Sequence, residues 1–259
     1  MGLRERWHAL WSSEPPAIEV ARKLDVKTGY NVRELGGYAV GAGETAWHRM
    51  IRSGSIDMLS EKDQRRLHDY GVRAVLDLRG FSERRVAPDK LAAMDSVRFK
   101  GVPFYDFNIS DPKLERPDDS GGYLTLGYLT MLANHEAVRE IFAFVARCEP
   151  EDCLLFHCAA GMDRTGMCAM LLLGVVGASR ERIVADYCYS FGSVEEVDAF
   201  IYDNRFAPSD ELLLRRAAIE AVYDRLMLAY GSFEEYLGEC GVTDAEIARV
   251  RAHLLRSCN

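Results

Sequence analysis

Residues 155–166 read Leu-Phe-His-Cys-Ala-Ala-Gly-Met-Asp-Arg-Thr-Gly and lie between two apolar segments. Five residues separate Cys158 from Arg164 in this stretch. A loop this short lets its backbone N–H groups turn toward one anion, and the planar guanidinium of Arg164 suits phosphate oxygens. A helix that begins near Arg164 would add the positive end of its dipole at the same point. The stretch therefore predicts an anion-binding loop in which the Cys158 thiolate is a nucleophile.

The segments on either side of this loop predict an α/β fold. Cys153–His157 has the pattern of a short central strand, and Arg164–Val176 that of a helix. Open α/β sheets bind ligands at the carboxyl ends of their strands, which is where this loop would lie. Its small residues would let the backbone approach a phosphate closely; they are Ala159, Ala160 and Gly161.

Strand and helix patterns alternate before the loop, and only helix patterns follow it. The expected strands are a hairpin within Ala39–Ile51, then Val72–Leu78 and Val97–Phe104. Before the loop, helices are expected from a capping box at Ser60–Asp63 to Gly71, over Tyr123–Ala133 and over Glu136–Arg147, with a flexible loop at Asp111–Gly122. Later helices are expected over Ser179–Tyr189, Val194–Tyr202, Asp210–Tyr230, Ser232–Leu237 and Thr243–Leu255, with Gly177, Gly231 and Gly241 at helix ends.

Composition indicates a globular chain of enzyme size. Of its 259 residues 48% are hydrophobic and 28% charged, and its net charge is −8. This charge argues against sequence-independent nucleic-acid binding, so an anionic substrate has to be captured by a local pocket.

The chain also shows no targeting, membrane or disulfide signal. Its N-terminus lacks a signal-peptide pattern, and its longest apolar stretch, Met167–Val176, is too short to span a bilayer. Its seven cysteines contain no Cys-x-x-Cys pair, which indicates neither a disulfide framework nor a zinc site. We expect a cytoplasmic protein without membrane insertion, although a secreted form without its leader would look similar.

The segment His157–Gly166 resembles the signature loop of the cysteine-dependent tyrosine phosphatases. It is most similar to bacterial tyrosine and lipid phosphatases whose loop reads His-Cys-x-x-Gly-Lys-Asp-Arg-Thr-Gly. Other segments agree with this subgroup in order, namely Asn31–Tyr38, Ile51–Gly54, Val75–Arg79, Ile183–Tyr187 and Tyr230–Leu237. The resemblance implies a twisted, mainly parallel sheet with helices on both faces.

The similarity covers residues from about 18 to 256. Because we find no repeat and no long linker, we expect one phosphatase domain over residues 1–259. Residues 1–17 would form a helical extension, and residues 178–259 would form an all-helical part of the same domain.

Met162 departs from the subgroup pattern, which has lysine at this position. In that family the lysine adds positive charge to the pocket, a feature associated with phosphoinositide head groups. Met162 leaves the cradle for one phosphate intact, so the departure favours phosphotyrosine over lipid substrates. Its side chain could pack against a substrate ring.

A phosphatase of this type also needs a general acid that protonates the leaving oxygen. Asp106 and Asp111 follow the expected strand Val97–Phe104. The family places its acid soon after an apolar-Pro-Phe segment, which favours Asp106, whereas Asp111 also fits a turn before Pro112. Asp163, inside the loop, could orient Arg164 or assist water, or could hydrogen-bond the loop backbone.

Several other residues have a predicted supporting role. His157 would order the loop and tune Cys158, and the Thr165 hydroxyl could hydrogen-bond the sulfur and ease its departure. Three arginines in family-like segments could line the cleft, but ion pairing with Glu34, Asp77 or Glu83 is favoured for them; they are Arg33, Arg52 and Arg79.

The expected reaction is two-step phosphoryl transfer through a cysteinyl phosphate, without metal or cofactor. The substrate would be a phosphotyrosine-containing protein or another phosphomonoester. Dual-specificity or phosphoinositide phosphatase activity is the main alternative, ahead of a rhodanese-type sulfurtransferase and a non-catalytic phosphoprotein-binding module. If Cys158 is oxidised as a switch, Cys153 and Cys168 are candidate resolving thiols. The sequence does not indicate an oligomeric state.

Overall fold

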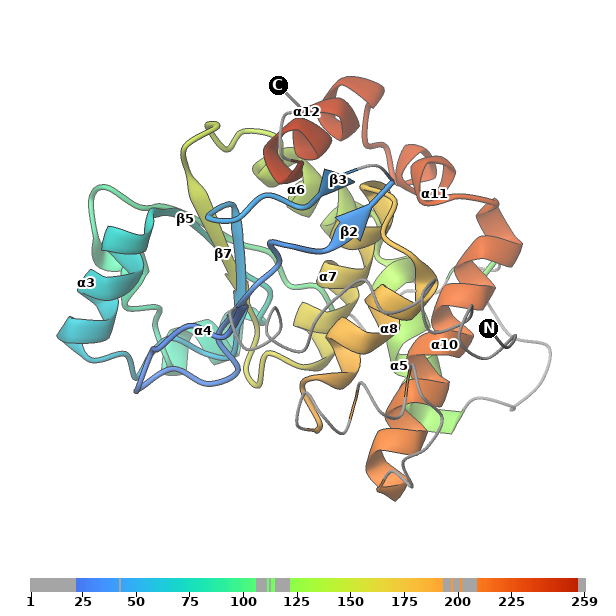
Figure 1. Cartoon of the computed structure of the whole chain (residues 1–259), viewed down its shortest axis with the longest axis horizontal. Helices are drawn as coiled ribbons and strands as arrows, with labels where there is room; N and C mark the ends of the chain where they lie inside the picture. Colours follow the sequence, from blue (N-terminus) through green and yellow to red (C-terminus); the bar gives the residue numbers. More distant parts are fainter. Residues whose placement is uncertain are drawn as a thin grey trace, which may run out of the picture.

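A five-stranded, mainly parallel sheet lies at the centre of the molecule. The computed structural model describes residues 22–41, 43–105, 111, 113–114, 122–192, 197, 201 and 209–255. The strand order is β1-β4-β7-β5-β6, in which only β1 runs antiparallel to its neighbour. Its strands are β1 (Arg33–Glu34), β4 (Met50–Ser53), β5 (Val72–Asp77), β6 (Arg98–Gly101) and β7 (Cys153–His157). The strand that leads into Cys158 is therefore central, as predicted (Figure 1).

A small hairpin accompanies this sheet. Strands β2 (Ala39–Val40) and β3 (Gly43–Glu44) pair antiparallel, which confirms the hairpin expected within Ala39–Ile51. The extended segment after it is β4, whose four residues are all buried.

Helices cover both faces of the sheet. Apolar side chains along β7 alternate between two cores, as side chains of a strand must. Leu154 and Phe156 join a large core, whereas Cys153 and Leu155 join a smaller one that includes Leu67. Leu67 lies on α3, which lies apart from the helices that pack around α7 (Figure 1). The helices are α3 (Glu61–Tyr70), α4 (Phe81–Val86), α5 (Gly122–Ala133), α6 (His135–Val145), α7 (Asp163–Val175), α8 (Arg180–Cys188), α10 (Asp210–Tyr230), α11 (Phe233–Glu239) and α12 (Asp244–Leu254), with a 3-10 turn η1 (Leu91–Ala93).

Helix α7 is buried on every side. Each residue from Thr165 to Val175 is buried, which fits a helix that is apolar all round. It packs against α5, α8, α11 and α12 and against β4 and β7. The helix that starts at the Cys158 loop is thus fixed by the core, and the loop has a rigid foundation at that end.

Polar residues and glycines bound the helices where the sequence indicates. Ser60 caps α3 by accepting a hydrogen bond from the Asp63 backbone N–H. The Asp63 carboxylate accepts from Thr28 and from the Ser60 hydroxyl, whereas the Ser60 backbone N–H donates to the Thr28 hydroxyl and not to Asp63. Three glycines predicted at helix C-termini have φ between 82° and 83°, which glycine adopts without strain; they are Gly177, Gly231 and Gly241.

One predicted strand was too long, and two short elements were not predicted. Strand β6 ends at Gly101 and not at Phe104, although Val102 and Phe104 still donate backbone hydrogen bonds to Asp77 and Leu78. Helix α4 and turn η1 were not predicted, because six and three residues are too few to show a helical period. Most of the expected loop Asp111–Gly122, the expected helix Val194–Tyr202 and the extension 1–17 lie outside the described residues.

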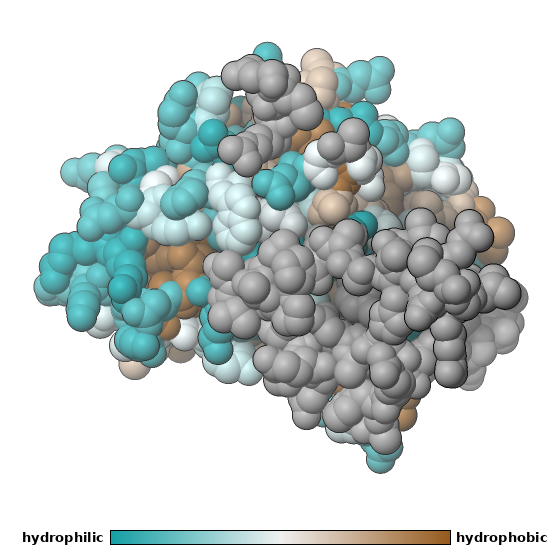
Figure 2. Space-filling model, in the orientation of Figure 1, coloured by the Kyte–Doolittle hydropathy of each residue, from teal (hydrophilic) through white to brown (hydrophobic). Residues whose placement is uncertain are grey.

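The surface over α3 is strongly polar. Exposed charged residues lie along this helix. Figure 2 shows hydrophilic side chains at the end of the molecule where Figure 1 places α3. In the part of the chain that the structure describes, no helix is both long and apolar enough to cross a membrane.

Gly174→Ala should destabilise the protein through the contact between α7 and α11. A Cβ at Gly174 would lie 2.4 Å from ring carbons of Phe233, and such overpacking costs about 1–3 kcal/mol. Gly238→Ala in α11 is the matched control, because its Cβ meets nothing within 4 Å and alanine favours helix by up to about 1 kcal/mol. Urea unfolding of both variants measures the two effects, and equal stability of the two would contradict this packing.

Candidate active site

The Cys158 loop leaves β7 at His157 and enters α7 at Asp163. The Cys158 side chain is buried, and the Gly161 backbone N–H donates a hydrogen bond to its sulfur at 3.3 Å. Ala159 and Ala160 are exposed, and Met162 is half-buried. A loop amide therefore points at the sulfur, while the neighbouring residues remain open to solvent, as a phosphate cradle requires.

Gly161 fits the loop because no side chain can be accommodated there. Its φ is +71°, and a Cβ would lie 2.5 Å from the Gly54 nitrogen. Its carbonyl accepts hydrogen bonds from Asn31 Nδ2 at 2.9 Å and from Arg52 Nη2 at 3.0 Å. The loop therefore packs closely against the segment after β4, and hydrogen bonds from Asn31 and Arg52 hold it there.

A buried ion-pair network supports Arg52. The Asp186 carboxylate accepts from Arg52 Nη1 and from Arg33 Nε, and all three side chains are buried. Burial alone would raise the pKa of the Asp186 carboxyl, but Arg52 and Arg33 bring that pKa below its ordinary value. Arg33 and Arg52 are ion-paired as predicted, but their partner is Asp186 and none of the predicted carboxylates. Glu34 instead accepts hydrogen bonds from Gly36, His48 and Tyr70.

Arg164 pairs with a carboxylate at the start of α4. Its Nη1 and Nη2 donate to the two carboxylate oxygens of Glu83 at 2.6 and 2.9 Å, and Gly80 N–H donates to the same carboxylate at 2.8 Å. Glu83 was expected to pair with another arginine. Because a guanidinium carries five N–H donors and Glu83 takes two, Arg164 retains donors for a phosphate.

His157 contacts two acceptors and lies beside a second ion pair. Its Nδ1 is 3.1 Å from the Cys158 carbonyl oxygen, and its Nε2 is 3.0 Å from Asp89 and 3.8 Å from Asp77. Arg79 donates to both carboxylate oxygens of Asp77 through Nε and Nη2, which confirms the predicted ion pairing of Arg79.

Asp77, Asp89 and His157 could between them offer three ligand atoms to a metal ion. A cation there would have to displace the guanidinium of Arg79. The described contacts are those of a set of ion pairs.

Two loop side chains make contacts other than those predicted. Asp163 accepts from Tyr128 Oη and, at 2.8 Å, from Arg215 Nη1, so it links the loop to α5 and α10 and touches neither Arg164 nor the loop backbone. The Thr165 hydroxyl donates to the Ser53 carbonyl at 3.5 Å and not to the sulfur.

Of the two candidate general acids, the structure describes only Asp111. Asp106 lies outside the described residues. Asp111 is buried, and its carboxylate binds Tyr230 Oη, His135 Nε2 and the Lys113 backbone N–H. Three partners inside the fold give Asp111 a structural role.

The other described cysteines lie in or against the core. Burial raises the pKa of five thiols, including those of the candidate resolving residues Cys153 and Cys168. The other three are Cys148, Cys188 and Cys240.

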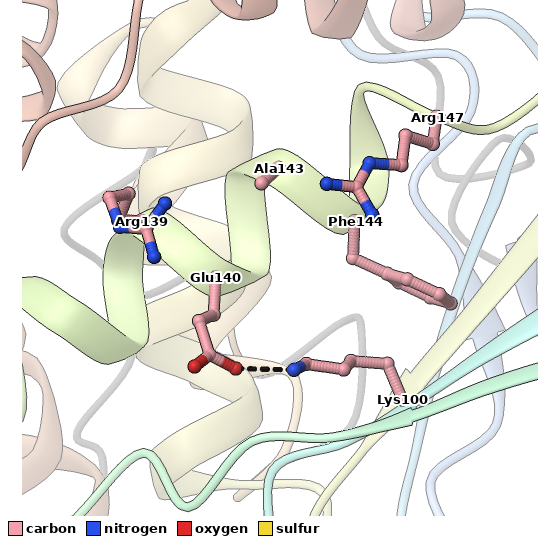
Figure 3. A pocket seen from close by; sticks show the side chains of 6 residues that line it. All are labelled: Lys100, Arg139, Glu140, Ala143, Phe144 and Arg147. Carbon is pink, nitrogen blue, oxygen red and sulfur yellow. Dashed lines mark ion pairs between the residues drawn. The ribbon is translucent and has the colours of Figure 1, made fainter.

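A separate pocket lies between α6 and β6. Its volume is about 200 Å³, and none of its lining residues belongs to the Cys158 loop. Figure 3 shows Arg139 and Arg147 on either side of Ala143, with Lys100 paired to Glu140 at 2.5 Å. Arg147 follows the last turn of α6, where a cation stabilises the helix dipole.

A cysteine at the end of a central parallel strand, with a loop amide on its sulfur and an arginine in the next helix, is the arrangement expected of a cysteine-dependent phosphatase. The tyrosine phosphatase family matches residues 24–256, and the chain belongs to this family. It is accordingly a phosphoric monoester hydrolase.

Three curated bacterial proteins resemble the chain over most of their length. A Cupriavidus necator protein named as a candidate tyrosine-protein phosphatase is 28% identical over 96% of this chain and 94% of its own. The triple specificity protein phosphatase PtpB of Mycobacterium tuberculosis is 28% identical over 80% of this chain and 91% of its own. A tyrosine-protein phosphatase of Nostoc commune is 27% identical over 79% and 73%.

Sequence reasoning missed several partners of the loop. Asp186 lies in the family-like segment Ile183–Tyr187, so only its role was missed. Glu83 was named, but with another partner. Nothing local in the sequence marks the rest, because they come from distant helices or an irregular segment; they are Asp89, Tyr128 and Arg215.

Asp186→Asn should cost about 3–5 kcal/mol, because it leaves two buried guanidiniums without their counterion. The carboxyl has a lowered pKa in the folded protein, so its stabilising effect is present above about pH 4, the unfolded value, and is lost as pH falls through the folded pKa. The stability difference from the parent protein should thus be largest near neutral pH and shrink in acid.

Urea unfolding at several pH values measures this difference. Asp224→Asn is the control, because the Asp224–Arg180 pair is on the surface and contributes at most about 1 kcal/mol. A difference between parent and Asp186→Asn that does not depend on pH would contradict the ion-pair account.

Proposed function

We propose that the protein hydrolyses phosphotyrosine in proteins through a cysteinyl-phosphate intermediate. The observation that carries this proposal is the hydrogen bond from the Gly161 N–H to Cys158 Sγ, inside a loop between a central strand and a buried helix. Family membership and the three relatives support the same reaction class. The match over residues 24–256 also supports one phosphatase domain.

In the first step the loop amides and Arg164 bind the phosphate. The Cys158 thiolate attacks phosphorus in line and forms the S–P bond while the bond to the tyrosine oxygen breaks. Positioning and charge stabilisation supply most of the catalysis, and Arg164 stabilises charge on the equatorial oxygens. His157 supports the loop behind the sulfur.

Asp106 is proposed as the general acid that protonates the leaving oxygen. The involvement of the Asp111 carboxylate with Tyr230, His135 and Lys113 supports this choice over Asp111. In the second step water attacks phosphorus, Asp106 takes its proton, and the S–P bond breaks to return the thiolate.

The exposed neighbours of the sulfur support a substrate with an aromatic leaving group. Ala159, Ala160 and Met162 present an apolar surface beside the cradle. Each described arginine next to the loop has a carboxylate partner, so the residues that the structure describes form one phosphate cradle and supply no spare cation for a second phosphate.

Cys158→Ser should abolish turnover of p-nitrophenyl phosphate while binding of a phosphotyrosine peptide is preserved. The reason is that serine at this position leaves the cradle but is not ionised at neutral pH. Steady-state kinetics and peptide titration measure the two properties. Turnover at the parental rate would contradict the nucleophile assignment, and a parent protein that binds without turnover would be a non-catalytic binding module.

Asp106→Asn should lower kcat more than Asp111→Asn does. General acid catalysis typically contributes about 10²–10⁴-fold, whereas loss of Asp111 removes only structural contacts. The comparison uses a phosphotyrosine peptide, and thermal unfolding of both variants separates catalysis from stability. The reverse order of kcat values would transfer the acid role to Asp111.

Met162→Lys should raise activity on polyphosphorylated inositol lipids relative to phosphotyrosine peptide, because it adds a cation at the rim of the cradle. The assay is a panel of phosphotyrosine and phosphoserine peptides with mono- and polyphosphorylated inositol lipids. Leu228→Lys, which adds the same charge at an exposed position near the end of α10, is the control. A parent protein that prefers the lipids would contradict the phosphotyrosine assignment.

A further inference from the structure

His157 lies between two oxygen atoms, one of a backbone carbonyl and one of a carboxyl group. The Cys158 carbonyl oxygen is 3.1 Å from Nδ1, and an Asp89 carboxylate oxygen is 3.0 Å from Nε2. A backbone carbonyl never donates, so Nδ1 must carry a proton to make its hydrogen bond. The protonation of the ring therefore depends on whether the Asp89 oxygen accepts or donates.

The contacts of Asp89 identify its carboxyl group as ionised. Its other oxygen accepts backbone N–H hydrogen bonds from Leu91 at 2.9 Å and Ala92 at 3.3 Å. Such bonds favour the carboxylate over the neutral acid. An ionised Asp89 accepts from Nε2, and then both ring nitrogens of His157 carry protons.

The surrounding charges fit an imidazolium. His157 is fully buried, and five charged or titratable groups face it or its partners from β5, from the segments that follow β5 and from the loop. Asp77 lies 3.8 Å from Nε2 but is occupied by Arg79, Asp89 is the free counterion, and Cys158 and Arg164 lie on the loop side. Arg79 with Asp77 and His157 with Asp89 thus make two neutral pairs.

We propose that Asp89 is a positioning residue of the active site: it holds His157 as an imidazolium whose Nδ1–H fixes the Cys158 carbonyl and whose charge favours the Cys158 thiolate. The inference rests on the proposed nucleophilic role of Cys158. Asp89 does not touch the substrate and acts through the ring. It contacts the ring nitrogen opposite the one that contacts Cys158, so the positively charged ring, and not Asp89, is the member of the pair that touches the Cys158 backbone.

This arrangement sets the direction of the effect of Asp89→Asn. Without the carboxylate, a fully buried imidazolium loses its free counterion, and the ring becomes neutral because an isolated buried charge is costly. The positive charge beside the sulfur disappears, and the Cys158 thiol should ionise at higher pH. If the ring stayed charged, loss of a nearby negative group would shift the ionisation of Cys158 to lower pH instead.

The first experiment observes the ring itself. In ¹⁵N-histidine-labelled protein, NMR shifts of the two His157 ring nitrogens, assigned with His157→Gln, report whether both are protonated at neutral pH. We expect two protonated nitrogens in the parent protein and one in Asp89→Asn. A neutral tautomer in the parent protein would overturn the proposal. Because no substrate is involved, this result is independent of the proposed function.

The second experiment measures the thiolate. The pH dependence of iodoacetamide alkylation at Cys158, followed by peptide mass spectrometry, gives its ionisation midpoint. Asp89→Asn should slow alkylation roughly tenfold below the parent midpoint, which corresponds to a shift of about one pH unit. His157→Gln should give a similar shift, and the double variant should give no further one, since both changes remove the same charge.

Asp63→Asn is the matched control. Asp63 is also a buried carboxylate that accepts backbone and hydroxyl hydrogen bonds, from Thr28, but it lies at α3 and not at the loop. Its variant should lose stability without moving the alkylation midpoint. An unchanged or lowered midpoint in Asp89→Asn would overturn the role of Asp89. If Asp89→Asn raises the alkylation midpoint as expected but the parent protein shows no phosphatase activity, the proposed function alone is refuted.

Discussion

One buried carboxylate, that of Asp186, neutralises two buried guanidiniums, and the catalytic loop is tied to one of them. Arg52 contacts Asp186 with one terminal nitrogen and the Gly161 carbonyl with the other. In a planar trans peptide the carbonyl and the following N–H point in opposite directions. Because Arg52 holds the Gly161 carbonyl oxygen toward the buried network, the N–H of the next residue, Met162, points away from that network and toward the side of the loop where an anion would bind. The cradle thus depends on a charge network that substrate never meets.

The same principle extends around the loop. Every described arginine next to it has a carboxylate partner: Arg52 with Asp186, Arg79 with Asp77, Arg164 with Glu83 and Arg215 with Asp163. These pairs hold the arginines in fixed positions and leave little net charge around the site. Recognition of phosphate then rests on directed N–H groups and not on an excess of positive charge. This agrees with a chain whose net charge is −8.

The sequence predicted the fold and the loop because both depend on local patterns. The strand Cys153–His157 was placed to the residue, since its four apolar residues form one run that ends at His157, and all five are buried. Helix α10 was also placed to the residue, over Asp210–Tyr230 with Gly231 at its end, although its cap Ser209 was not predicted. The partners Asp89, Tyr128 and Arg215 could not be found in this way, because tertiary packing alone brings them to the loop. Thr165 shows the opposite error. Its hydroxyl was predicted to hydrogen-bond the neighbouring Cys158 sulfur, but it donates to the Ser53 carbonyl of β4.

The burial of the other thiols has a consequence for covalent chemistry. Five of the cysteines lie in or against the core with raised pKa values, whereas Cys158 sits beneath a loop whose alanines are exposed. An electrophile small enough to enter the cradle meets the proposed nucleophile there, and elsewhere in the described part of the chain it meets thiols whose pKa burial has raised. The protein should therefore behave toward mild electrophiles as though it carried one reactive thiol in this part, and a warhead joined to a phosphate mimic would find its target by shape and charge together.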